Sequence, residues 1–154
     1  MWQQVKPVVD SGMAALCRRP YPLHPKGCPN WGKKAGCPPK CKPIGELLDL
    51  KAPVWAIWTQ FNLHDHMVRM QEKHPGWSER QLKCCLYWQP RARRNLHDEL
   101  IRFIMEVHPD AIVTTPEASG VNLTETMKQV GVQLEWPPEN WTYQVVLAGK
   151  KFLS

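Results

Sequence analysis

Regular patterns of hydrophobic and polar residues begin only after residue 46. Several short stretches there are rich in aromatic and β-branched residues and are bounded by proline, glycine or polar residues, which is typical of buried strands. The expected strands are residues 53–61, 111–115, 132–136 and 142–149.

Other stretches have the spacing and the end signals of helices. Residues 78–81 and 122–125 fit capping boxes, and Gly131 lies where the end of a helix favours a positive φ. Pro90 is expected to separate two helices, the second of which has apolar residues along one face. The expected helices are residues 65–73, 78–88, 91–107 and 122–131. This order of strands and helices predicts an α/β fold with a small mixed sheet and flanking helices.

The N-terminal third of the chain is different. Residues 1–45 hold eight of the 15 prolines and four of the six cysteines, and no hydrophobic period runs between Cys17 and Cys41. Because 154 residues are about the length of one domain, we expect a single domain over residues 1–154. Within it, residues 46–154 are the α/β core, and residues 1–45 form an irregular, cysteine-rich, basic segment that something other than a hydrophobic core must order.

The charge is also uneven along the chain. The formal net charge is +6, but residues 1–45 carry eight basic side chains and one acidic side chain, whereas the remaining residues sum to −1. A basic segment can indicate a nucleic-acid surface, an anionic ligand or compensation for negative charge that the protein itself holds. Four metal-bound thiolates carry such negative charge, so the basic residues alone do not decide between these interpretations.

Neither a membrane span nor a secretory signal is visible. The longest uninterrupted apolar run, residues 54–58, is far shorter than the roughly 18 residues of a membrane span. The first residues lack the apolar core of a secretory signal. We therefore expect no membrane association and a cytoplasmic, reducing location, in which six cysteines need a role other than disulfide formation.

Four cysteines lie within 25 residues, separated by ten, eight and three residues: Cys17, Cys28, Cys37 and Cys41. Only the last gap fits the short spacing of a zinc knuckle. Cys28 and Cys37 are each followed by proline, as is the last ligand of bacterial ferredoxin sequences. Few aliphatic residues surround these thiols, which disfavours a purely structural, buried role. The spacing alone leaves a [4Fe–4S] cluster and Zn²⁺ as equal alternatives.

The stretch from Cys28 to Cys41, CPNWGKKAGCPPKC, resembles the motif of a family of small, cysteine-rich, predicted metal-binding proteins of bacteria and archaea. Residues 116–131 are similar to the C-terminal element of that family, in a looser match. The resemblance implies a metal centre and favours iron–sulfur over zinc, but it supplies no reaction. The chain departs from the family pattern at Ser119, where many members have cysteine, and in the lack of a further cysteine-rich stretch. Only Cys84 and Cys85 remain, in an expected helix, so we expect a single cluster.

The leading hypothesis is that one [4Fe–4S] cluster is held by these four N-terminal cysteines and has a redox role. An open iron site would instead permit a cluster-dependent or sulfur-handling reaction. Arg18, Lys33 and Lys34 are the candidate anion contacts, the expected partners are a redox protein or a small anionic substrate, and no catalytic residue is predicted. The alternative is a structural zinc site that presents a basic loop to RNA or DNA.

Overall fold

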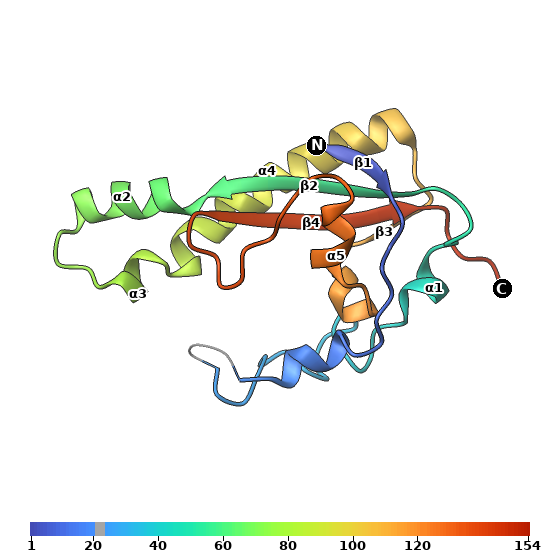
Figure 1. Cartoon of the computed structure of the whole chain (residues 1–154), viewed down its shortest axis with the longest axis horizontal. Coiled ribbons are helices and arrows are strands. Elements are labelled where there is room, and N and C mark those ends of the chain that lie inside the picture. The colour runs from blue at the N-terminus through green and yellow to red at the C-terminus, as the bar shows by residue number, and fades with distance from the viewer. Residues whose placement is uncertain (21–23) are drawn as a thin grey trace.

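The computed structural model describes residues 1–20 and 24–154. Its centre is a four-stranded sheet in the order β1-β2-β4-β3 (Figure 1). The strands are β1 (Trp2–Val5), β2 (Val54–Asn62), β3 (Ala111–Val113) and β4 (Trp141–Gly149). With its helices, this sheet forms a small α/β fold, as predicted.

Every pair of neighbouring strands in the described sheet is antiparallel, so the expected mixed sheet was wrong in this detail. β2 and β3 run in the same direction, but both of them pair with β4, which lies between them. A parallel pair would need these two strands to be neighbours.

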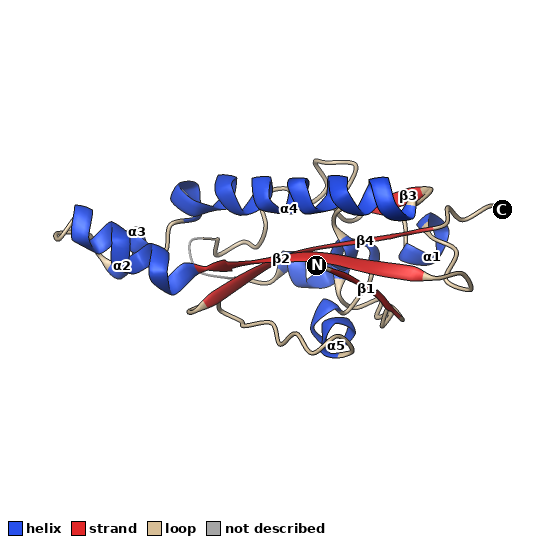
Figure 2. Ribbon diagram, turned by 90° about the horizontal axis from the view of Figure 1, so that it is seen from above, coloured by secondary structure: helices blue, strands red, loops and turns tan. Residues whose placement is uncertain are grey.

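The two long central strands alternate between the faces of the sheet. On one face, Ala56 and Leu147 join a core to which α1 (Ile44–Leu47) and α5 (Leu123–Lys128) contribute. On the other face, Ile57 and Val146 pack with Phe103 of α4. Figure 2 shows the sheet between α4 and α5. The chain therefore buries both faces of a small sheet, which accounts for the continuous apolar run of β2.

The helix α4 (Cys85–Val107) is one element of 23 residues, and Pro90 lies inside it. The expected break at Pro90 was wrong. The chain breaks earlier, at Cys84, after the short helix α3 (Glu79–Leu82), whose capping box at Ser78 is confirmed. A proline near the start of a helix removes one hydrogen bond, here to the carbonyl of residue 86. Leu86 is 77% exposed, so water can reach that carbonyl.

Three other expectations can be compared with the structure. The helix α2 (Leu63–Lys73) and the positive φ of Gly131, 75°, are confirmed. Residues 132–136 form no strand, although Val132 and Leu134 pack against the core. The central strands already have a neighbour on each side, so no edge of theirs remains for this stretch.

In the described part of the chain, no helix is long and apolar enough to cross a membrane.

Candidate metal centre

The cysteine loop, which we define as residues 11–45, lies below the sheet in Figure 1, next to the 3-10 helix η2 (Pro116–Ser119). Both ends of the loop are tied to the core. Before it, the backbone N–H of Asp10 donates to Gly120 O at 2.6 Å. At its other end, Ile44 is fully buried in the core cluster. The loop is therefore attached to the core on both sides of its four cysteines.

Cys17 and Cys28 are brought together by their backbones. Cys17 belongs to the 3-10 helix η1 (Ala14–Arg18), and the N–H of Cys28 donates to Cys17 O at 2.6 Å. Gly27 has φ +84°, and a Cβ at this position would lie 2.6 Å from Cys17 O. Only glycine permits this approach, because any side chain would meet backbone atoms and would also adopt a strained conformation.

Cys37 and Cys41 lie on one turn of chain. The N–H of Cys41 donates to Cys37 O at 3.1 Å, which is the i to i+4 spacing that places two side chains on one face. Gly32, four residues after Cys28, donates its N–H to Pro38 O at 2.7 Å. These backbone hydrogen bonds connect the part of the loop that carries Cys28 to the turn that carries Cys37 and Cys41.

The four thiols are half-buried, and two of them, Cys17 and Cys41, have shifted pKa values. Burial raises the pKa of the Cys17 thiol, and the nearby Cys28, Cys37 and Cys41 raise it further. Burial also raises the pKa of Cys41, with a further contribution from Cys37. Of the four cysteines that the sequence selected, Cys28, Cys37 and Cys41 thus lie near enough to Cys17 to affect its thiol.

The helix η2 forms one side of this cluster of thiols. Cys41 Sγ donates to Ala118 O at 3.0 Å, and Thr115 Oγ1 donates to Gly36 O at 2.9 Å. Glu117 is close enough to Cys17 to raise the pKa of its thiol, and burial raises the pKa of the Glu117 carboxyl itself. Ser119 is buried here. Sequence reasoning singled out residues 116–131 by resemblance but gave Glu117 and Ala118 no role.

The donor set of the loop suits a metal centre, because thiolates are the ligands that zinc and iron–sulfur clusters prefer. As they lie, however, no three His, Cys, Asp or Glu side chains among residues 1–20 and 24–154 are grouped closely enough to hold a metal ion. A preformed site is uncommon before the metal binds, since binding and local folding are coupled. Ligation by these cysteines therefore requires the sulfurs to move closer together.

The three candidate anion contacts, Arg18, Lys33 and Lys34, are all exposed on the cysteine loop. The guanidinium carbon of Arg18 lies 5.4 Å from the ring centroid of Trp31, a cation–π contact. Trp31 is half-buried, and its backbone N–H donates to Cys28 O at 3.2 Å. Positive charge and an aromatic ring are thus placed beside the candidate centre.

Cys84 and Cys85 lie elsewhere, at the start of α4 and not in mid-helix as expected. Cys84 is half-buried and Cys85 is exposed. Neither is among the groups that shift the pKa of Cys17 or Cys41. They are therefore natural controls for the four loop cysteines.

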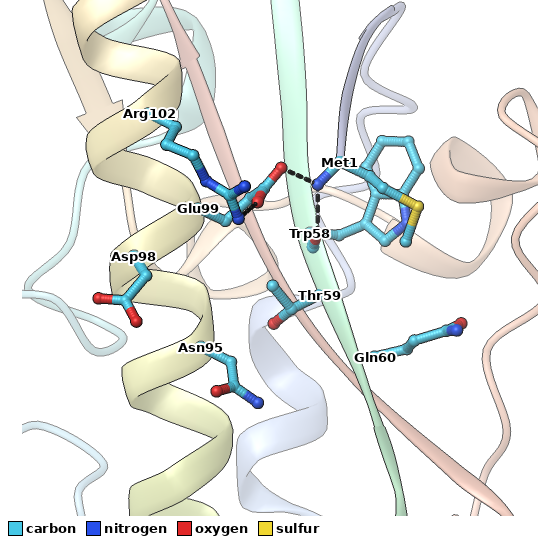
Figure 3. Close-up of a pocket in the computed structure, with 8 residues that line it drawn as sticks. All are labelled: Met1, Trp58, Thr59, Gln60, Asn95, Asp98, Glu99 and Arg102. Carbon is cyan, nitrogen blue, oxygen red and sulfur yellow. Dashed lines mark hydrogen bonds and ion pairs between the residues drawn. The ribbon is translucent and has the colours of Figure 1, made fainter.

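A shallow pocket between β2 and α4 contains none of these cysteines (Figure 3). The buried carboxylate of Glu99 accepts hydrogen bonds there from Arg102 and from the amino group of Met1. Two positive charges compensate this carboxylate. The buried charge in the pocket is therefore accounted for by an ion-pair network that joins α4 to the start of the chain, next to β1.

We find no match for this chain among protein-family models, curated proteins or solved structures. The fold and the cysteine loop therefore describe it as a small α/β protein with a cluster of four thiols, and its function is argued from that cluster.

Proposed function

We propose that Cys17, Cys28, Cys37 and Cys41 bind one [4Fe–4S] cluster and that the protein transfers electrons. The observation that carries this proposal is that four half-buried thiols lie in one loop, with Cys28, Cys37 and Cys41 near enough to Cys17 to raise its pKa. Thiols with raised pKa values stay protonated in the absence of a cation. A bound metal would reverse this, because it stabilises the thiolate.

The cysteine loop also lacks a hydrophobic core of its own, and a bound cluster would supply cross-links in its place. Of the described residues from 11 to 43, only Gly27 and Pro38 are buried, so hydrophobic packing contributes little to its order. A cluster bound by four cysteines would cross-link three successive parts of the loop, and its binding energy would become folding energy.

Electron transfer is the favoured role because the loop supplies a complete set of four thiols. A [4Fe–4S] cluster with four cysteine ligands has no open iron for a substrate. Its potential depends on burial, on hydrogen bonds to sulfur and on nearby charge. The exposed Arg18, Lys33 and Lys34 would favour the reduced, more negative state and raise the potential. A reaction on a small anionic substrate would need one cysteine to leave the ligand set.

A second candidate function is a structural zinc site that holds a basic loop for RNA or DNA. The spacing of Cys37 and Cys41, with three residues between them, supports it, since structural zinc sites use such short pairs. The positive charge of the loop fits phosphate groups equally well.

Optical spectroscopy under reduction tests the proposal. The protein purified without oxygen is expected to show a broad visible absorption that bleaches when dithionite is added and returns on reoxidation. Cys85→Ser serves as the matched control, because Cys85 is an exposed cysteine outside the loop and should leave the spectrum unchanged. A protein without visible absorption, before and after reconstitution with iron and sulfide, would overturn the proposal.

A further inference from the structure

The cysteine loop carries an unbalanced positive surface. Residues 11–45 include no aspartate and no glutamate. Their seven arginine and lysine side chains are all exposed. We call these residues the basic loop surface: Arg18, Arg19, Lys26, Lys33, Lys34, Lys40 and Lys42.

None of these cations is used in an ion pair within the described part of the chain. The ion pairs there join Glu99 to Arg102 and to the Met1 amino group, Glu79 to Lys83, and Glu125 to Lys128. Outside the loop, the charges of the chain nearly cancel. The positive surface is thus confined to the part of the molecule that carries the four thiols.

A bound centre would compensate only part of this charge. Four thiolates around a [4Fe–4S] cluster in its usual oxidised state carry a net charge of about −2, and a zinc ion with four thiolates carries the same. Seven cations exceed this by about five charges. Such an excess of positive charge costs stability through self-repulsion, and it attracts anionic partners.

We propose that the basic loop surface docks an acidic electron-transfer protein. This inference rests on the proposed cluster, because the partner would deliver one electron to it. Electron-transfer complexes are weak and small, and complementary charge steers their encounter. The half-buried thiols place the candidate centre just beneath this surface, where a docked partner would come close to it.

The aromatic side chains of the loop favour a protein partner over a nucleic acid. Binding of single strands uses exposed aromatic rings on which bases stack. Trp31, the aromatic residue of the loop that the structure describes, is half-buried and is covered by the guanidinium of Arg18. One face of its ring is therefore already occupied, which disfavours stacking with a base.

The test measures binding of a fluorescently labelled acidic flavodoxin by anisotropy, at low and at high ionic strength. We expect Lys33→Glu combined with Lys34→Glu to weaken binding by about tenfold or more at low salt, because reversed charges remove the electrostatic attraction. The matched control reverses Arg93 and Arg94, which lie on α4 against one face of the sheet, and should leave binding nearly unchanged (Figure 2). If the first variant does not fold, Lys40→Glu with Lys42→Glu replaces it.

Electron transfer is followed on the same samples after the flavin of the flavodoxin has been reduced. One electron leaves the reduced flavin and enters the cluster, so the visible absorption of the cluster falls as the flavin is oxidised. Absence of saturable flavodoxin binding, or loss of binding to an equal extent in the α4 control, would overturn the docking proposal. Neither result would contradict the proposal that the four cysteines bind a cluster.

Two further outcomes separate the alternatives. Tighter, salt-dependent binding of a single-stranded RNA 12-mer that is lost in the Lys33 and Lys34 variant would overturn the docking proposal in favour of a nucleic-acid partner. Charge-dependent flavodoxin binding by a protein that contains no iron would overturn the proposed function, and with it the electron-transfer role of the surface.

Discussion

The α/β core and the cysteine loop are ordered by different interactions. In the core, Ile57, Phe103 and Leu147 are completely buried, and both faces of the sheet are covered. In the loop, hydrogen bonds between backbone groups replace apolar packing, and half-buried thiols occupy the centre. The comparison teaches that one chain can combine a part that folds through burial of apolar surface with a part that has little apolar surface to bury, for which we propose a bound cofactor.

The largest expected effect is in the loop. Cys37→Ser should remove the bound metal and most of the order of residues 17–41, because structural metal sites contribute about 10 kcal/mol or more of binding energy to folding. Metal analysis together with amide hydrogen exchange would measure both effects. Cys84→Ser is the control and should retain the metal. Full metal content in the Cys37 variant would contradict the ligand assignment.

The reverse experiment removes a core contact. Phe103→Ala should lower the free energy of unfolding by about 3–5 kcal/mol, as is typical for a large aromatic residue in a packed core. Phe103 is completely buried and contacts the rings of Trp2 and Trp55. Denaturant unfolding measures the loss. The metal content per folded chain should stay unchanged, and a parallel loss of metal would show that the two regions are not independent.

A substitution at Gly27 should act within the loop at a smaller scale. Gly27→Ala places a Cβ against Cys17 O and in a positive-φ conformation, which costs about 1–3 kcal/mol in strain and weakens metal binding accordingly. Competition with a chelator measures the affinity. Gly131→Ala is the control, because Gly131 also has a positive φ but nothing lies within 4 Å of its added Cβ. Equal metal affinities in the two variants would contradict the role of the close approach.

The smallest effect concerns pH and the core. Burial lowers the pKa of His66 below its usual range near 6.5, and Arg69 adds to this. The unfolded chain then binds a proton at a pH where the native protein does not, so stability should fall as the pH drops from about 6.5 through the lowered native pKa. Above that range, His66 should make no pH-dependent contribution.

Thermal unfolding between pH 5 and 8 measures this dependence. His66→Phe should reduce it, because His66 Nε2 is buried without a hydrogen-bond partner among the described residues and the ring packs against Phe61. His64→Gln, at an exposed position two residues earlier, should keep the same pH dependence of thermal stability as the unsubstituted protein. Identical pH profiles for both variants would assign the effect to another group.

The sequence predicts the strands β2 and β4 well because each is a nine-residue stretch rich in aromatic and β-branched residues. Prediction from the sequence fails where the secondary structure of a stretch depends on its surroundings in the fold. Val132 and Leu134 have the composition of a strand, but both edges of β2 and of β4 are already paired, and these two residues pack against the core instead. The four residues of β1 are too few to give a pattern, and their pairing with β2 depends on residues about 50 positions away. Pro90 breaks helices in general, but here water can satisfy the carbonyl that it leaves unpaired.

In the candidate site, too, local features could be predicted from the sequence and contacts between distant residues could not. Local spacing selects Cys17, Cys28, Cys37 and Cys41, and the last three lie near enough to Cys17 to raise the pKa of its thiol. The contact of Cys41 with Ala118, 77 positions later, follows from the packing of η2 against the loop and leaves no local signal. The nature of the metal depends on electronic preference and supply more than on spacing, so it stays a prediction.

The iron, acid-labile sulfide and zinc content of protein purified without oxygen tests the central claim most directly. A [4Fe–4S] cluster predicts about four irons and four sulfides per chain, and little zinc. One zinc per chain and no sulfide would contradict the claim and would make the cysteine loop a structural zinc site.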